Sequence, residues 1–143
     1  MTAKTYEEIA VGDAAAFEVV VDGALVAKFA AVSGDENPLH VDASYAATTP
    51  FGKPIAHGML VEALFSRLIG MHLPGRYALY LSQTLRFHEP IPLGTTVRIR
   101  GEVTHKTDAH QTLAVRTTAE DAVSGKVLVS GEAMVAVLHP HDI

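Results

Sequence analysis

Apolar and polar residues follow a helical spacing in the first third of the chain. Asp22 can cap a helix over residues 23–33, because apolar side chains recur on one side of that segment and Gly34 then interrupts it. A short strand over 17–21 precedes this helix, and a short helix over 42–48 follows the polar residues after Gly34. The pattern therefore predicts short elements on both sides of a polar turn.

The longest apolar segment, residues 57–73, predicts the central element of the fold. It is apolar around most of a helical circumference, which is typical of a buried helix, and Pro74-Gly75 ends it. From Arg76 onward apolar residues recur at every second position, with a turn at Ser124-Gly125 and a last strand over 127–138. A very hydrophobic helix followed by a hairpin-rich antiparallel sheet predicts an α+β domain in which the sheet wraps the helix.

The length and charge of the chain narrow the classes of fold and partner. At 143 residues we expect one domain over 1–143. The chain has 11 Lys and Arg against 16 Asp and Glu, a formal net charge of −5, and no dense basic run, which argues against nucleic acid and anionic membranes as partners. Glu62, Arg67 and Glu132 interrupt the apolar stretches that would otherwise suggest a membrane span, and the N-terminus does not resemble a signal peptide.

The residue types limit the chemistry and the location. With no cysteine, disulfides, thiol nucleophiles and cysteine-based zinc sites are excluded, and a cytoplasmic location is weakly favoured. The sequence contains no Gly-rich phosphate loop and no Gly-x-Ser-x-Gly motif. The C-terminal histidines, including His139 and His141, lack the spacing of a closed metal site. We expect neither a metal nor a redox cofactor.

The segment Ser33-Gly34-Asp35-Glu36-Asn37-Pro38-Leu39-His40 carries the strongest chemical signal. It places a carboxylate, an amide and an imidazole on a turn whose glycine and proline interrupt a continuous helix. Asp35 and His40 are suited to moving protons between water and a substrate, and Asn37 is suited to orienting a group. Asp and Asn also satisfy backbone groups in turns, so the residues alone support catalysis and turn-building about equally.

The pair His57-Gly58 opens the central helix. Gly58 would present a free backbone N–H in the first helical turn, where the helix dipole favours an anion, and would let a ligand approach closely. A close-packing role for Gly58 is a serious alternative. For His57, capping or packing at the helix start is the better-supported role.

Residues 29–46 resemble the MaoC-like (R)-specific enoyl-CoA hydratases. They match the family pattern position by position: an aromatic, two spacers, an aliphatic, Ser, Gly-Asp-x-Asn-Pro, an aliphatic, His, and a small residue after five spacers. The similarity continues through Ile55-Ala56-His57-Gly58-Met59-Leu60, Leu73-Pro74-Gly75 and Tyr80-Leu81-x-Gln83-x-Leu85-x-Phe87. The resemblance implies a single hot-dog domain, in which an antiparallel sheet wraps a long helix, and a homodimer with pockets at the subunit interface.

The resemblance also implies an activity, namely hydration of trans-2-enoyl-CoA to (R)-3-hydroxyacyl-CoA and the reverse dehydration, without a cofactor. In this interpretation Asp35 and His40 hold and activate the water, with the order of their roles open, and Asn37 supports them. The backbone N–H of Gly58 would stabilise the thioester oxygen. Some relatives carry a serine at the position of Ala63, so a polar contact carried over from them is in doubt here.

The acyl pocket is expected beside the first turns of the central helix, lined by Met59, Ala63 and Leu64. Three alternatives stay open. A 3-hydroxyacyl-acyl-carrier-protein dehydratase would run the same chemistry on a protein-bound thioester, and charge does not separate it from a CoA enzyme. A hot-dog thioesterase would hydrolyse the thioester, and an acyl-CoA binding module would lack the proton-transfer pair.

Overall fold

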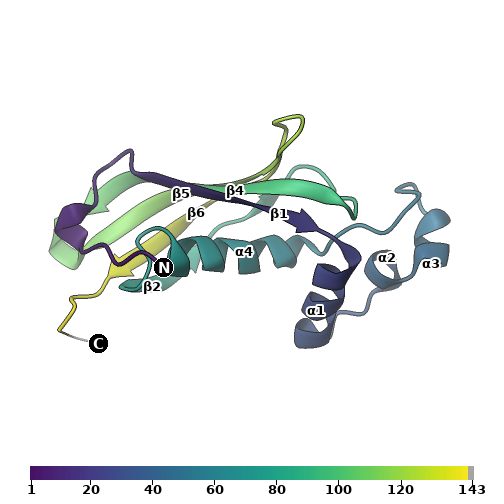
Figure 1. The fold of residues 1–143 in the computed structure, drawn as a ribbon, viewed down its shortest axis with the longest axis horizontal. Coiled ribbons are helices and arrows are strands. Elements are labelled where there is room, and N and C mark those ends of the chain that lie inside the picture. Colours follow the sequence, from purple (N-terminus) through teal and green to yellow (C-terminus); the bar gives the residue numbers. More distant parts are fainter. Residues whose placement is uncertain (142–143) are drawn as a thin grey trace.

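The computed structural model describes residues 1–141 and consists of one antiparallel sheet laid over a long central helix (Figure 1). The strand order is β1-β4-β5-β6-β2, and the short β3 also pairs with β6. All of these strand pairs are antiparallel. The strands are β1 (Ala14–Val21), β2 (Ala78–Gln83), β3 (Arg86–Phe87), β4 (Thr95–Thr107), β5 (Thr112–Asp121) and β6 (Val127–Val137). The predicted α+β class with a helix wrapped by an antiparallel sheet is confirmed.

Three shorter helices gather near the N-terminal end of the central helix (Figure 1). The helices are α1 (Gly23–Ser33), α2 (Pro38–Val41), α3 (Ala43–Ala47) and the central α4 (Gly58–Met71), with 3₁₀ turns η1 (Tyr6–Glu8) and η2 (Asp108–His110). The bounds predicted for α1 agree with the structure, while the short α2 within the polar segment was not predicted. Within residues 1–141, none of the helices is both long and apolar enough to cross a membrane.

The inner face of α4 fixes the helix on the sheet. Its buried side chains are Leu60, Val61, Leu64, Phe65, Leu68 and Ile69. Burying a side chain of this size contributes about 1.5–3 kcal/mol, so sliding or rotating the helix would be costly. The helix also rests closely on β4, because a Cβ at Gly101 would lie only 2.7 Å from Leu68 Cδ2. The N-terminal turn of α4 is therefore held in a defined place beside α1 and α2.

Candidate active site

Asp35 lies in the turn that links α1 to α2. Gly34 ends α1 with a φ of 76°, a left-handed conformation that glycine adopts without strain. Asp35 Oδ1 accepts the backbone N–H of Asn37 at 3.1 Å, and Asn37 Oδ1 accepts that of Leu39 at 3.0 Å. Both side chains thus build the turn, and Asn37 caps the helix that carries His40. The Asp35 side chain is nevertheless 51% exposed, so its Oδ2 is open to another partner.

His40 lies on α2 with one ring nitrogen fixed by the backbone. Its Nδ1 is 2.8 Å from the carbonyl oxygen of Ile55. Because a carbonyl oxygen only accepts hydrogen bonds, Nδ1 carries a proton and donates it. In a neutral imidazole the other nitrogen, Nε2, is then unprotonated and can act as a base. A single contact with the segment before α4 therefore sets both the orientation and the tautomer of this ring.

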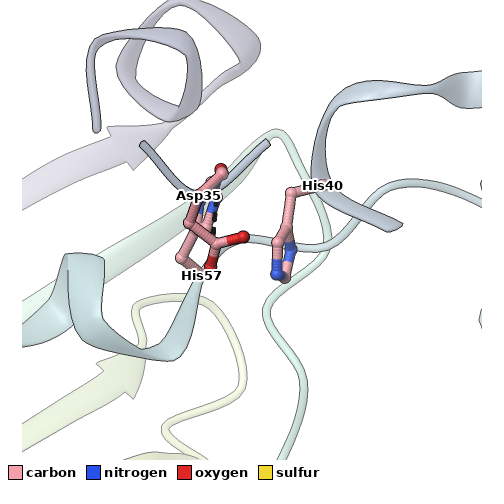
Figure 2. Close-up of side chains that lie close together, drawn as sticks. All are labelled: Asp35, His40 and His57. Atoms are coloured by element: carbon pink, nitrogen blue, oxygen red, sulfur yellow. Dashed lines mark hydrogen bonds and ion pairs between the residues drawn. The ribbon is translucent and has the colours of Figure 1, made fainter. Parts of the chain in front are cut away.

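His57 connects the polar turn to the start of α4. The residue is only 2% exposed, and its Nε2 donates to the backbone carbonyl of Asp35 at 2.9 Å. Its ring lies against those of His40 and Phe29, with centroids 3.9 and 4.9 Å apart. Figure 2 shows the side chains of Asp35, His40 and His57 converging from the turn, α2 and the residue that precedes α4. His57 therefore has the expected packing role, and the residues that it packs against include Asp35 and His40, which are expected to do the chemistry.

Sequence reasoning did not anticipate that His57 holds the Asp35 backbone. The two residues are separated by 22 positions, and no spacing rule for helices or strands connects them. The nearest signal in the sequence was the apolar run after His57, which indicates that the start of this helix is buried. A buried histidine needs hydrogen-bond partners for its ring nitrogens, and these must come from neighbouring segments of the fold. Within residues 1–141 the Nδ1 atom of His57 is buried without a hydrogen-bond partner.

Gly58 is the first residue of α4 and lies under the ring of Phe87. A Cβ added to Gly58 would be 2.7 Å from Cε1 of Phe87, which is closer than real Cβ contacts. The close-packing role is therefore present in the structure. The backbone N–H of the first residue of an α-helix has no partner four residues earlier within the helix, so the donor role proposed for Gly58 is compatible with its position.

Two cavities flank the first turns of α4. The first, called here the histidine cavity, has a volume of about 510 Å³, and its lining includes His40, Ile55, Gly58, Met59, Phe87 and Ile91. The second, called here the glutamate cavity, has a volume of about 580 Å³, and its lining includes Met59, Glu62, Ala63, Ser66, Tyr80 and Gln83. Met59 lines both, so its side chain forms part of the wall of each cavity.

The three residues expected to line the acyl pocket differ in their positions. Met59 borders both cavities, and Ala63 borders the glutamate cavity. Leu64 borders neither: it is 8% exposed and belongs to the hydrophobic core under the sheet. At about 100° per residue, Ala63 lies about 40° around the helix from Met59 and Leu64 about 140° from it, so Ala63 shares the cavity side of the helix and Leu64 turns inward. The expectation for Leu64 is corrected accordingly.

The side chains of Asp35, His40 and His57 could also be considered as metal ligands. One ligating atom from each lies within 4.8 Å of the other two. Asp35 Oδ2 and His57 Nε2 lie 4.0 Å apart, which exceeds the roughly 3.4 Å between ligands that bind one zinc ion at about 2.1 Å in a tetrahedron. Two of the ring nitrogens already donate to backbone carbonyls. The present arrangement fits proton transfer better than metal coordination.

Comparisons with known proteins identify the family of this chain. The family model described as MaoC like domain matches residues 9–124. The chain is 43% identical to the (R)-specific enoyl-CoA hydratase of Aeromonas caviae over 129 residues, which cover 90% of this chain and 96% of that protein. It is 36% identical to the 3-hydroxybutyryl-CoA dehydratase of Methylorubrum extorquens over 132 residues, 92% of this chain and 83% of that protein.

Solved structures give the same result. The unliganded R-hydratase PhaJ1 from Pseudomonas aeruginosa matches with a TM-score of 0.90 and 41% sequence identity, over 94% of this chain and 86% of that one. The family model covers most of the chain, including the turn with Asp35 and His40 and the start of α4. The chain therefore belongs to the MaoC-like domain family.

Proposed function

We propose that this protein is an (R)-specific enoyl-CoA hydratase, which adds water to trans-2-enoyl-CoA and catalyses the reverse dehydration of (R)-3-hydroxyacyl-CoA. The observation that carries the proposal is the spacing of Asp35 and His40. A carboxylate oxygen of Asp35 and a ring nitrogen of His40 lie within 4.8 Å of each other. Two groups that each bind one water at about 2.8 Å are about 4.6 Å apart, so a separation of at most 4.8 Å lets a single water reach both groups.

The chemistry assigns a role to each group around that water. The water oxygen bonds to C3 while Asp35 takes its proton and His40 orients it. A proton from the same pair is then delivered to C2, so both groups end in their starting state. Asp35 and His40 act from one side of the flat enoyl group. The water oxygen at C3 and the proton at C2 are therefore added to the same face of the double bond.

The backbone N–H of Gly58 completes the proposed site. Negative charge develops on the thioester oxygen as water attacks, and a donor already in place stabilises it without reorganisation. Gly58 borders the cavity that also contains His40, and the positive end of the α4 dipole lies there. Asn37 supports the site indirectly, since its side chain caps the helix of His40.

Coenzyme A is the proposed carrier of the acyl group. Two relatives that match most of this chain have names that specify CoA thioesters. The test is the loss of enoyl-thioester absorbance with crotonyl-CoA, with free-thiol release and product chirality measured in parallel. Formation of (R)-3-hydroxybutyryl-CoA without thiol release is expected. Thiol release at the rate of absorbance loss would identify a thioesterase instead. A much higher rate with crotonyl-acyl carrier protein than with crotonyl-CoA would identify the carrier-protein thioester as the substrate.

A homodimer is part of the proposal. Strand β2 forms one edge of the sheet and exposes Leu79 and Leu81 by 47% and 53%, and an unpaired apolar edge is a template for pairing with another chain. Light scattering after size exclusion should give twice the chain mass of 15.2 kDa. A fully active monomer at assay concentration would contradict this. The proposal also places the enzyme in the cytoplasm, which cell fractionation would check.

A further inference from the structure

The glutamate cavity continues along α4 from the place where the thioester is proposed to bind. Glu62 follows Gly58 by four residues, so it lies on the same face of the helix about one turn, roughly 6 Å, further along. Phe29, whose ring contacts His57, also lines this cavity, and Met59 borders both this cavity and the histidine cavity. An acyl chain that leaves Gly58 along α4 therefore reaches Glu62 after its first few carbons.

The polar groups opposite Glu62 are already paired. The hydroxyl of Tyr80 donates to Gln83 Oε1, and Gln83 Nε2 donates to the backbone carbonyl of Thr84 at 2.7 Å and to Thr117 Oγ1 at 2.9 Å. Burial and, secondarily, the negative charge of Glu62 raise the pKa of Tyr80 to about 12. The phenol therefore stays protonated and bound to Gln83 at neutral pH, and it is not free to neutralise the carboxylate.

The Glu62 carboxylate differs from its neighbours because it has no hydrogen-bond or ion-pair partner among residues 1–141. The histidine cavity also contains a glutamate, Glu89, but its carboxylate pairs with Lys126 at 2.7 Å. Placing a plain alkyl chain against Glu62 would remove water from an anion and return no hydrogen bond, which is costly. A hydroxyl at the same place would replace the lost water as a donor.

We propose that the glutamate cavity is an acyl subsite in which Glu62 selects acyl groups that carry a hydroxyl beyond their first few carbons and disfavours alkyl groups of the same length. This inference rests on the proposed function, because the thioester must be held near Gly58 for the chain to follow α4. It adds a substrate class, the distally hydroxylated enoyl thioesters. Glu62 acts here as a specificity-determining residue and takes no part in the proton transfers.

The test compares two substrates of nearly equal shape, 6-hydroxy-trans-2-hexenoyl-CoA and trans-2-heptenoyl-CoA, which differ by a terminal hydroxyl in place of a methyl group. The measured quantity is the ratio of their kcat/KM values. Because both are measured on the same variant, a general loss of activity cancels. The wild type should favour the hydroxylated substrate by about tenfold or more, since a site with an unpaired polar group discriminates strongly against a substrate that cannot pair with it.

Two variants remove the carboxylate in different ways. Glu62→Leu should abolish the preference, lowering the ratio by about tenfold or more. Glu62→Gln keeps the side-chain size and an acceptor oxygen, so it should lower the ratio less than Glu62→Leu does. If circular dichroism shows that the leucine variant is not folded, the ratio of the glutamine variant is the test. Glu89→Gln is the matched control for a glutamate in the neighbouring cavity, and its ratio should equal that of the wild type.

The outcomes separate this inference from the proposed function. If the wild type hydrates crotonyl-CoA but uses the heptenoyl substrate as well as the hydroxylated one, the subsite assignment is wrong and the hydratase assignment stands. The same conclusion follows if both Glu62 variants keep the wild-type ratio, or if Glu89→Gln shifts it equally. No hydration of any enoyl-CoA by the wild type would instead remove the function on which the inference rests.

Discussion

The histidine cavity and the glutamate cavity lie on either side of Met59 and have similar volumes, about 510 and 580 Å³. They differ in how their polar groups are arranged. In the first, apolar walls surround His40, whose Nδ1 is fixed by a backbone carbonyl while its Nε2 is free. In the second, Tyr80 and Gln83 are paired with each other, and the Glu62 carboxylate has no partner in the part of the chain that the structure describes.

This difference separates chemistry from selection along a single helix. A free imidazole nitrogen beside a helix N-terminus suits proton transfer to a bound thioester. A carboxylate one turn later has no proton-transfer partner at hand, but it changes which acyl groups can be desolvated there. Variants of the histidine cavity should therefore change turnover of every substrate, whereas variants of the glutamate cavity should change the ranking of substrates.

The largest effect is expected at the proton-transfer pair. Asp35→Asn and His40→Ala should each lower kcat by at least about a hundredfold, the usual scale for a positioned acid or base. The double variant should be little worse than the poorer single one, because both residues act on one water. Stopped-flow or steady-state hydration of crotonyl-CoA measures this, with circular dichroism as the folding control. Near-wild-type turnover in either folded single variant would refute the assignment.

A smaller effect is expected at Gly58. Gly58→Ala should lower kcat about tenfold to a hundredfold, since its Cβ intrudes where the thioester must be aligned. The Cβ would also crowd Phe87, at 2.7 Å from Cε1, so the single variant mixes two causes. The double variant Gly58→Ala with Phe87→Ala removes the crowding. If kcat stays low relative to Phe87→Ala alone, the thioester is obstructed; recovery to that level would leave Gly58 with a packing role only.

The sequence was sufficient where local signals decide the structure. Asp22 caps α1 by accepting the N–H of Leu25 at 2.9 Å, and Gly34 ends that helix in the left-handed conformation, both from side-chain chemistry visible in the sequence. The proximity of Asp35 and His40 likewise follows from a short turn. These elements needed no knowledge of the rest of the chain.

The sequence was insufficient where distant segments meet. The Ile55 carbonyl that fixes His40 and the Phe87 ring that covers Gly58 come from other parts of the fold. Leu64 was misplaced for a different reason. Segment 57–73 is apolar on most sides, so its periodicity could not tell which face turns toward the core. Only the packing of α4 on the sheet shows that Ala63 faces the glutamate cavity and Leu64 faces the core.

The next effect concerns Ala63, which borders the glutamate cavity. Ala63→Leu should fill part of that cavity and raise discrimination against long acyl chains by roughly one to three kcal/mol, while sparing crotonyl-CoA. The measurement is kcat/KM for four-, six- and eight-carbon enoyl-CoA substrates. Leu64→Ala is the matched comparison, because its core position predicts a loss of stability of about 2–5 kcal/mol without a change in substrate ranking. An equal fall for all three substrates in Ala63→Leu would mean that the residue does not border the acyl tail.

The smallest effect is expected at Met59. Its side chain is 49% exposed and borders both cavities, so truncation removes little core packing and mainly opens space between the two. Met59→Ala should raise kcat/KM for eight-carbon relative to four-carbon enoyl-CoA by roughly threefold to tenfold, the scale of about one newly buried methylene group. In the double variant with Ala63→Leu this gain should shrink, because the added leucine occupies the space that the truncation opens. If Met59→Ala instead lowers kcat/KM equally for the eight- and four-carbon substrates, the Met59 side chain orients the thioester, and the two cavities do not form one path for the acyl chain.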